Sequence, residues 1–455
     1  MLGSLPAALA RLGDTVGVVA PRYRGVLLPR ERIWDAMPVH VGPHSFTAGI
    51  DQVVRHGVRY FFVDIPALYD RAGLYYDAGG DYGDNHIRFA ALCQAAIGIA
   101  RHIFHPSVFH AHDWQAGLLP LYLRENFRGD PTFFKTRTVL TIHNLGYQGN
   151  FPAGALRDLG IHPALFHPEG VEFYGRLSLL KAGIIWADAI TTVSPTYARE
   201  IQTPEFGFGM DGLLRSRADK LTGILNGVDY SEWNPEHDRY IPAHYSARDL
   251  SCKRACKLAL LQEAGLPADT GKPLLAVISR LAYQKGMDLA AAAVPWIVSQ
   301  GAAVVTLGSG EGHLEAVFRG LEAAHPQSVA VNIGYDEALS HRIEAGADMF
   351  LMPSRYEPCG LNQIYSLRYG TVPVVRATGG LEDTVDEETG FKFRDYTFEA
   401  CTGAISAALS AYRNPADWAE RMKKGMAKDF SWEASARQYQ AVYRSASRSA
   451  AEHHF

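Results

Sequence analysis

Residues 353–363 read PSRYEPCGLNQ, and this stretch decides the fold of the chain. It follows the short apolar run 349–352, so Glu357 and a glycine turn fall where a strand ends and a helix begins. A second glycine turn, TGGL, occupies residues 378–381. Backbone N–H groups at such turns are unpaired and lie at the positive end of a helix dipole. They therefore suit a phosphate or sugar ligand.

Two cations stand upstream in a similar position. The segment SRLAYQKG, residues 279–286, places Arg280 and Lys285 just after the strand expected over 274–278, with Gly286 opening the next helix. Cations beside a helix N-terminus can neutralise a diphosphate and stabilise it as it departs. The alternative is that both are ordinary surface charges. The two glycine turns downstream favour a nucleotide-sugar site.

The carboxylate of Glu357 could orient a sugar hydroxyl or stabilise positive charge at an anomeric carbon. Its alternative role is that of a helix-dipole carboxylate near a helix N-terminus. Gly379 and Gly380 would let the backbone come close to a ligand, since neither residue carries a side chain. These residues form the donor side of the predicted site.

Short β-rich runs alternate with helical segments along the chain. The strand-like runs are 15–20, 58–63, 107–110, 138–142 and 189–193, then 274–278, 302–307, 328–332, 349–352 and 371–375. Segments 87–104 and 175–186 show the helical spacing of apolar residues. Near-continuous apolar strands joined by helices predict parallel sheets covered on both faces.

A polar run at 226–235 divides the 455 residues into halves of comparable size. We predict an α/β fold of two doubly wound domains facing a central cleft, because ligands bind at the carboxyl ends of such strands. The expected domains are 1–225 and 226–430, followed by a C-terminal helical segment, 431–455.

Composition narrows the class of partner. The net charge of −4 gives no electrostatic reason to expect nucleic acid or an anionic membrane. No apolar run reaches the length of a membrane span. The five cysteines form no metal-type CxxC pair, so we expect reduced thiols in a cytoplasmic protein. Oligomeric state is left open.

Two motifs in the first half also end strands. HAHDW, residues 110–114, clusters two histidines with an aspartate, but no second ligand cluster supports a metal site. Asp113 as an acceptor of sugar hydroxyls and Trp114 as a stacking surface fit better. TIHNLGYQG, residues 141–149, places His143 beside a glycine-bearing loop. A lone histidine is usually a core residue, but this position makes His143 a site candidate.

Several motifs of other chemistries are missing from the sequence. There is no Asp-x-Asp pair to hold a divalent cation under a diphosphate, so we predict a metal-independent site without a cofactor. Neither a Walker sequence nor a GxSxG nucleophile elbow occurs.

The ordered motifs carry a specific resemblance. HAHDW, TIHNLGYQG, LKAGIIWADAITTVSPTYAREI, LNGVD, SRLAYQKG, PSRYEPCGLNQ, TGGLEDTV and DFSW resemble bacterial glycogen synthase and plant starch synthase, glycosyltransferase family 5. The resemblance runs from about residue 2 to residue 443. It implies the GT-B architecture of two Rossmann-like domains. It also implies transfer of glucose from ADP-glucose to the non-reducing 4-OH end of an α-1,4-glucan, with retained configuration, in glycogen biosynthesis.

The same resemblance assigns roles to single residues. Arg280 and Lys285 match the family's diphosphate cations, Glu357 lies against the donor glucose, and His143 and Asp113 reach the sugar from the first domain. The other implied contacts are the backbone of Cys359, Gly360 and Leu361 on glucose, Tyr335 on adenine, Asn362 on phosphate, and Asn226 on the interdomain face. The last helix is expected to cross back onto the first domain.

Retention can arise by double displacement, which needs a nucleophilic carboxylate paired with an acid. The sequence offers Glu357 and no obvious partner, so front-face substitution is favoured, with the departing diphosphate helping to deprotonate the acceptor hydroxyl.

Two departures from the family pattern are expected to matter differently. The family opens with a strand and a KTGGL loop, which residues 1–6 do not contain, so we expect the true start upstream. A shorter loop at 385–391 should have little effect. Alternative functions are a UDP-glucose-dependent or other GT-B transferase, a glucan phosphorylase, and a catalytically impaired glucan-binding form.

Overall fold

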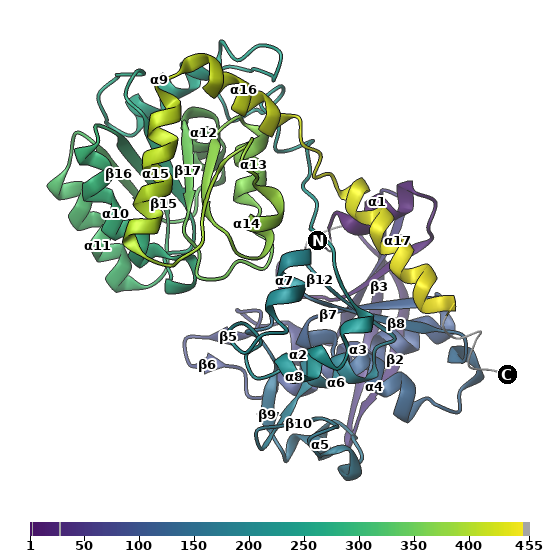
Figure 1. Cartoon of the computed structure of the whole chain (residues 1–455). Coiled ribbons are helices and arrows are strands. Elements are labelled where there is room, and N and C mark those ends of the chain that lie inside the picture. The colour runs from purple at the N-terminus through teal and green to yellow at the C-terminus, as the bar shows by residue number, and fades with distance from the viewer. Residues whose placement is uncertain (2, 27–28, 449–455) are drawn as a thin grey trace. The chain divides into compact units, whose positions relative to one another are not determined.

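The computed structural model describes residues 1, 3–26 and 29–448, and the chain divides into two compact units. The first unit contains Met1–Val193, Ala198–Ile224 and Trp432–Phe455, and the second contains Ser194–Tyr197 and Leu225–Ser431. The sequence predicted a boundary between residues 225 and 226. In the structure, four residues from the first half, 194–197, also belong to the second unit. Figure 1 shows the course of the chain.

The elements of the first unit are numerous and range from two-residue strands to the 18-residue helix α3. Its strands are β1 (Val16–Pro21), β2 (Glu31–Val41), β3 (His44–Arg55), β4 (Val58–Asp64), β5 (Tyr76–Asp77), β6 (Gly80–Asp81), β7 (Val108–His112), β8 (Arg137–Ile142), β9 (Asn150–Pro152), β10 (Glu172–Phe173), β11 (Arg176–Ser178), β12 (Ala189–Thr192) and β13 (Leu221–Gly223). Its helices are α1 (Leu5–Arg11), α2 (Pro66–Tyr69), α3 (Asn85–His102), α4 (Leu118–Leu121), α5 (Ala155–Asp158), α6 (Leu179–Trp186), α8 (Asp211–Arg215) and α17 (Trp432–Arg448). Helix α7 (Pro195–Glu200) begins within the 194–197 segment.

Two four-stranded sheets organise this unit, in the orders β1-β4-β3-β2 and β13-β12-β8-β7. All neighbours in the second sheet are parallel, whereas in the first only β1 and β4 are parallel. The prediction of parallel sheets is therefore confirmed for the second sheet, whereas the first sheet is mixed. The long hairpin β2–β3 alternates exposed and buried side chains near its turn, a pattern that a search for continuous apolar runs does not detect.

The C-terminal helix α17 packs within the first unit. Leu5, Ala8 and Leu9 of α1 form a buried cluster with Trp432 and Tyr439 of α17. The side chain of Arg11 also forms an ion pair with Glu433. Sequence ends that are far apart therefore share one small core, and Figure 1 shows α1 and α17 side by side.

The second unit is a regular doubly wound domain. Its strands are β14 (Leu274–Ile278), β15 (Ala303–Gly308), β16 (Val329–Ile333), β17 (Met349–Met352), β18 (Val372–Arg376) and β19 (Phe391–Phe393). Its helices are α9 (Lys253–Glu263), α10 (Met287–Ser299), α11 (Gly312–Ala324), α12 (Glu337–Gly346), α13 (Asn362–Arg368), α14 (Gly379–Thr384), α15 (Phe398–Tyr412) and α16 (Pro415–Met426). The five strands predicted in this half are confirmed to within one residue at each end.

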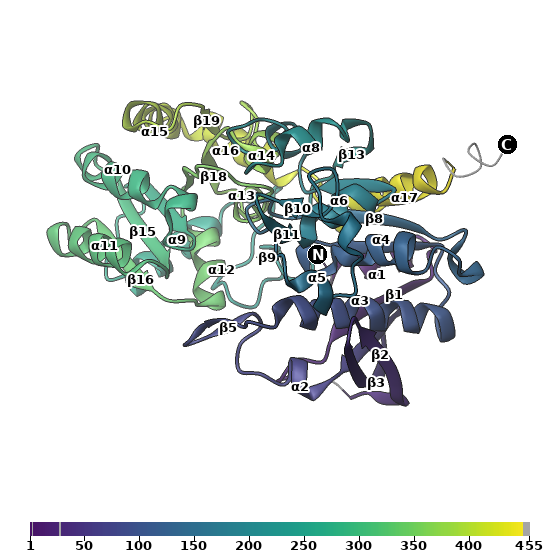
Figure 2. The ribbon, with the colours of Figure 1, turned by 90° about the horizontal axis from the view of Figure 1, so that it is seen from below.

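These six strands form one parallel sheet in the order β16-β15-β14-β17-β18-β19. Leu275 and Val277 face a core made with α10, α11 and α15, while Leu274 and Ala276 face a second core made with α9, α12 and α14. Burial on both faces explains why β14 reads as a continuous apolar run. Figures 1 and 2 show the helices on either side of the sheet.

Asp383 of α14 fixes the segment Ser194–Tyr197 in the second unit. Its carboxylate accepts hydrogen bonds from Ser194 Oγ, from the backbone N–H of Thr196 at 2.9 Å and from Thr196 Oγ1 at 2.6 Å. Hydrogen bonds to a charged acceptor contribute about 1.5–3 kcal/mol each. The carboxylate thus accounts for the attachment of these four residues.

Asp383→Asn should release this segment, because both carboxylate oxygens of Asp383 accept hydrogen bonds. An amide keeps one acceptor oxygen and places its NH₂ group, a donor, opposite the donors of Ser194 or Thr196. We expect a loss of about 2–4 kcal/mol in the free energy of unfolding and faster hydrogen exchange at the Thr196 amide. The exposed Asp395→Asn is the matched control and should change neither quantity. Unchanged exchange at Thr196 in Asp383→Asn would contradict this role.

Candidate active site

The predicted donor residues gather at the carboxyl ends of β14, β16, β17 and β18 in the second unit. From β14 the strand order runs outward to β15 and β16 toward one edge of the sheet. The chain then returns to β17, which pairs with the opposite side of β14. Ligands of doubly wound sheets bind at such a reversal of strand order. Lys285 follows β14 and Glu357 follows β17, so both lie beside the reversal.

Lys285 and Glu357 form a close ion pair there. Lys285 Nζ donates to both carboxylate oxygens of Glu357, at 2.8 and 2.7 Å, and Ser354 Oγ donates to one of them at 3.1 Å. The Glu357 side chain is only 6% exposed and that of Lys285 19%. The sequence singled out Lys285 and Glu357 separately. In the structure they form one ion pair, and their charges neutralise each other.

The glycine turns pack against protein backbone. A Cβ on Gly379 would lie 1.9 Å from the carbonyl oxygen of Glu357, and one on Gly380 would lie 1.8 Å from that of Cys359. The N–H of Gly380 donates to the Glu357 carbonyl at 3.0 Å. Gly286 similarly meets the Pro353 carbonyl, at 2.0 Å. The sequence predicted that Gly379 and Gly380 let the backbone approach a ligand. In the structure, the space that a Cβ would occupy at each of the three glycines is filled by the backbone of a neighbouring loop.

The remaining donor-side residues differ in their hydrogen bonds to the protein and in their exposure. Asn362 Nδ2 donates to the carbonyl of Ile278 at 2.8 Å, which ties α13 to the end of β14. Arg280 is exposed and donates to Gln284 at 3.1 Å. Tyr335 follows β16 with 88% of its surface exposed, a ring free to stack on a base.

Three further donor-side residues lie at the glycine turn. Cys359 is buried, which raises the pKa of its thiol to about 12. Leu361 is 38% exposed, and Gly360 adopts a left-handed φ of 70°. Asn226 reaches this turn through its backbone, which contacts the Cys359 thiol, and its Oδ1 is buried without a partner among the described residues.

Asp113 and His143 meet in the first unit, at the ends of β7 and β8. Asp113 Oδ1 accepts a hydrogen bond from the backbone N–H of His143 at 2.7 Å. Asp113 has φ 52° and ψ −166°, a conformation that is costly for a residue with a side chain and is concentrated at functional sites. Burial raises the pKa of this carboxyl to about 7, against the stabilising backbone N–H groups of His143 and Asn144.

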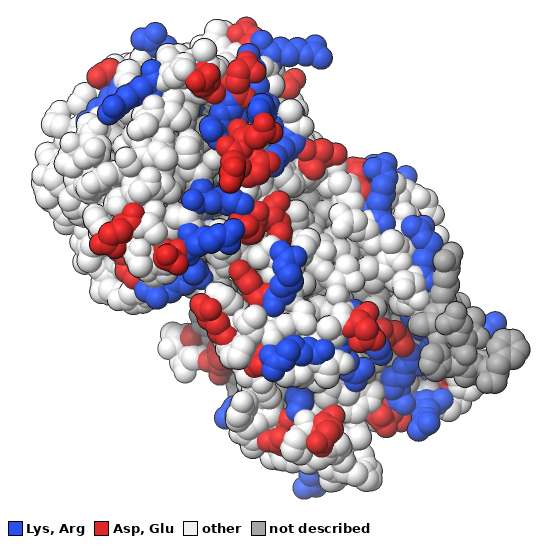
Figure 3. Space-filling model, in the orientation of Figure 1, with Lys and Arg blue, Asp and Glu red and all other residues white. Residues whose placement is uncertain are grey.

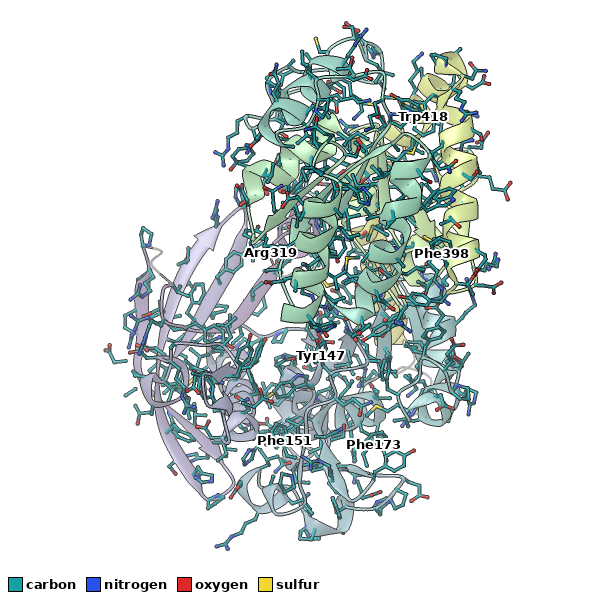
Figure 4. All side chains as sticks on the ribbon, turned by 90° about the vertical axis from the view of Figure 1, so that its left-hand side faces the viewer. Tyr147, Phe151, Phe173, Arg319, Phe398 and Trp418 are labelled. Carbon is teal, nitrogen blue, oxygen red and sulfur yellow. The ribbon has the colours of Figure 1, made fainter. Side chains whose placement is uncertain are left out.

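Trp114, predicted to stack on a sugar, packs against the protein. Its ring contacts Phe89 at 5.0 Å and Phe151 at 5.9 Å between centroids. A Cβ on Gly149 would lie 2.6 Å from the same ring. Figure 4 labels Phe151 and the neighbouring loop residue Tyr147, which is 57% exposed. Core packing accounts for these contacts of Trp114, and its sugar contact stays a prediction.

Three histidines lie next to one another at the ends of β7 and β8: His110 and His112 in β7, and His143 just after β8. His112 Nδ1 and His143 Nε2 are 3.1 Å apart, and the rings of His110 and His112 lie 4.2 Å apart. Burial lowers the pKa of His110 to about 3 and that of His143 to about 4. It also lowers the pKa of His112. All three are therefore neutral at pH 7.

These shifts predict acid sensitivity. In the unfolded chain histidine titrates at about 6.5, so below that pH the unfolded state binds more protons than the folded state. The free energy of unfolding therefore falls as the pH drops toward the folded pKa values of about 4 and about 3. Asp113 has the opposite sign, because its folded pKa is raised. Its contribution is present below the unfolded value of 3.8 and is lost as pH rises to about 7. Three histidines outweigh one carboxyl, so net stability should fall in acid.

We expect a loss on the order of 2 kcal/mol for each of His110 and His143 between about pH 6.5 and 4, with His112 acting in the same direction, read from melting temperatures. Asp113→Asn keeps the acceptor oxygen and removes the opposing contribution. The stability of this variant relative to the unsubstituted chain should therefore rise between pH 4 and 7. A difference that does not change with pH would contradict the buried, raised-pKa state of Asp113.

Sequence reasoning missed two parts of this site. Ser354, which donates to Glu357, lies inside the quoted stretch but carried no prediction. The loop after β15 was also missed: a Cβ on Gly308 would lie 1.9 Å from the Ser279 carbonyl, and one on Gly310 2.3 Å from that of Leu281. The GSG sequence at 308–310, following a strand, was the available signal.

Among the described residues, no group of three or more His, Cys, Asp or Glu side chains is placed to hold a metal ion. Over the same residues, no helix is long and apolar enough to cross a membrane.

Figure 3 shows basic and acidic side chains intermixed on one face of the protein.

Comparisons with known proteins agree with this geometry. The starch synthase catalytic domain family matches residues 1–216, and the glycosyl transferases group 1 family matches residues 261–425. The glycogen synthase of Anaeromyxobacter dehalogenans (strain 2CP-1) is 49% identical over 451 residues, covering 97% of this chain and 94% of that protein. That of Koribacter versatilis is 46% identical, covering 98% and 94%.

Solved structures give the same result. The catalytic domain of starch synthase IV from Arabidopsis thaliana, bound to ADP and acarbose, superposes with a TM-score of 0.88 at 31% identity, covering 98% of this chain and 95% of that one. Sucrose-phosphate synthase from Thermosynechococcus elongatus, at 19% identity and a TM-score of 0.60 over 97% and 91% of the two chains, shares the fold.

The sheet reversal, its Lys285–Glu357 pair and these matches define a glycosyltransferase with two Rossmann-like units, the GT-B architecture. The chain belongs to the glycogen synthase and starch synthase family. The family and fold predicted from the ordered motifs are thereby confirmed.

Proposed function

We propose that the chain transfers glucose from ADP-glucose to the non-reducing 4-OH end of an α-1,4-glucan, as in glycogen synthesis, with retention of configuration. The observation that carries the proposal is the Lys285–Glu357 pair at the strand-order reversal, with the exposed cation Arg280 on the same connection after β14. ADP in the related starch synthase structure supports the choice of nucleotide. Five unpaired cysteines fit a reducing compartment such as the cytoplasm.

Retention is best explained by front-face substitution. Both oxygens of Glu357 are engaged by Lys285, so this carboxylate is poorly placed to act as a nucleophile in a double displacement. The bond from the anomeric carbon to the diphosphate oxygen breaks while a bond to the acceptor O4 forms on the same face. The acceptor proton passes to the departing diphosphate, and the products are ADP and a glucan longer by one glucose.

The cations stabilise the charge that develops on the leaving group. Lys285 and Arg280 supply this positive charge in the proposal, so no divalent cation is required. Glu357 holds Lys285 in place and lies beside the donor sugar, while Tyr335 stacks on the adenine. Asp113 accepts from sugar hydroxyls, and His143 reaches the sugar.

The test is incorporation of labelled glucose into glycogen from ADP-glucose and from UDP-glucose, each with and without EDTA. We expect a higher kcat/KM with ADP-glucose, no effect of EDTA, and incorporated label that α-amylase releases in short α-1,4-linked fragments. A higher kcat/KM with UDP-glucose would overturn the nucleotide assignment. An EDTA-sensitive rate would overturn the metal-independent mechanism, and binding of glycogen without transfer from either donor would indicate the glucan-binding alternative.

A further inference from the structure

Two short motifs, HAH at 110–112 and TIH at 141–143, place three histidines on one face of a sheet in the first unit. His110 and His112 are two residues apart in β7, so their side chains lie on the same face. In the parallel pairing of β7 with β8, His112 lies opposite Thr141, and His143 follows Thr141 by two residues. The pattern therefore brings His112 and His143 together at the carboxyl ends of two neighbouring strands. The proposed reaction uses only His143 of the three.

A hydrogen bond joins the rings of His112 and His143. The distance between His112 Nδ1 and His143 Nε2 is 3.1 Å. Burial lowers the pKa of both imidazoles, so both are neutral at pH 7, and one of the two nitrogens must carry the proton while the other accepts it. The other ring nitrogen of His143, Nδ1, makes no hydrogen bond to the described residues, so it is available to a ligand. The partner at Nε2 thus decides whether Nδ1 carries a proton.

The direction of this hydrogen bond follows from the tautomers that it requires. Neutral histidine in water carries its proton on Nε2 more often than on Nδ1. If His143 Nε2 donates to His112 Nδ1, both rings adopt this commoner tautomer. The reverse direction requires the less stable Nδ1–H tautomer in both rings. The first arrangement is therefore favoured, and it leaves Nδ1 of His143 as an unprotonated acceptor.

His110 supports the ring of His112 from the other side. Its Nε2 lies 2.6 Å from Thr141 Oγ1, and its Nδ1 lies 2.8 Å from Tyr443 Oη of α17. Both nitrogens of His110 are thus engaged, so its ring cannot turn without the loss of a hydrogen bond. The rings of His110 and His112 pack with their centroids 4.2 Å apart. This packing limits the rotation of His112 and keeps its Nδ1 directed at His143.

We propose that His112 is a positioning residue for the transfer reaction. Its Nδ1 accepts a hydrogen bond from His143 Nε2–H, which fixes the ring of His143 and leaves Nδ1 of His143 to accept a hydrogen bond from a sugar hydroxyl. His112 acts through His143 and touches no substrate. This inference rests on the proposed glucosyl transfer and deepens the role of His143 in it. An acceptor that is oriented in advance does not have to turn when the sugar binds, so its interaction reaches the transition state in full.

The variants His112→Asn and His112→Leu form a matched pair. Their side chains have nearly the same shape, so both should lower the melting temperature to a similar extent. Asn can place its Oδ1 where Nδ1 of the histidine lies and accept from His143, whereas Leu cannot. We expect kcat/KM for ADP-glucose, with glycogen as acceptor, to fall about tenfold in His112→Leu, as for the loss of one neutral hydrogen bond, and by less than about threefold in His112→Asn. Equal values of kcat/KM in the two variants would overturn the inference, because His112 would then act through packing alone.

Nitrogen NMR of the histidine side chains tests the direction of the hydrogen bond without turnover. In protein labelled at histidine, the signals of His143 are assigned by their loss in His143→Asn. We expect a protonated Nε2 and an unprotonated Nδ1 on His143 at pH 7, retained in His112→Asn, and a mixture of both tautomers in His112→Leu. A protonated Nδ1 on His143 in the unsubstituted chain would overturn the inference. The spectra need no substrate, so they decide it even if transfer from ADP-glucose fails, a failure that would count against the proposed function alone.

Discussion

Lys285→Ala should lower kcat about 10²–10³-fold, because it removes a cation that stabilises the leaving diphosphate. Lys285 follows β14, at the reversal of strand order where nucleotides bind in such sheets. Since the charge on the diphosphate grows in the transition state, the loss should appear mainly in kcat. Lys272→Ala is the matched control, with the same change of charge at the amino end of β14.

A structural explanation of the same loss has to be separated from the catalytic one. Removal of Lys285 leaves the buried Glu357 carboxylate without its counter-ion, which costs about 3–5 kcal/mol for a buried pair. The double variant Lys285→Ala/Glu357→Gln removes both charges. We expect it to regain much of the lost stability and none of the lost turnover. Recovery of kcat together with stability, or near-normal kcat in Lys285→Ala, would refute the leaving-group role.

The sequence predicted this pair one residue at a time. Lys285 and Glu357 each stand after an apolar strand, and strand boundaries in the second unit were found to within one residue because both faces of that sheet are buried. Their pairing could not be predicted, since 72 residues separate them and only the order of strands brings them together. Strand order follows from the packing of the whole domain, and no local pattern encodes it.

The first unit was harder to predict for the same physical reason. Its β2–β3 hairpin exposes one face near its turn, so its residues alternate in polarity and no continuous apolar run marks either strand. Asp113 and His143 were found because each directly follows a strand that the sequence marked, β7 and β8 respectively. The strained φ of Asp113 has no signature in the sequence, because aspartate is also common in ordinary turns.

Gly380→Ala should strongly lower both stability and activity. The added Cβ would lie 1.8 Å from the Cys359 carbonyl oxygen and 2.5 Å from its carbon, so backbone has to move. The turn that would shift carries Glu357, whose carbonyl accepts from the Gly380 N–H. We expect a loss of roughly 3 kcal/mol in stability and, because a shift of about 1 Å misplaces the site, a fall of about 10²-fold in kcat/KM for the sugar nucleotide.

The control is a glycine in the same kind of structure without a neighbour. Gly403 lies inside α15, and a Cβ there meets nothing within 4 Å. Gly403→Ala should therefore raise stability by up to about 1 kcal/mol, as alanine does in helices, and leave turnover unchanged. If Gly380→Ala behaves like Gly403→Ala in both melting temperature and kcat/KM, the glycine turn does not set the position of Glu357. Opposite signs in the two stabilities would show that the missing side chain at Gly380 is required by the fit of α14 against the Glu357–Cys359 turn.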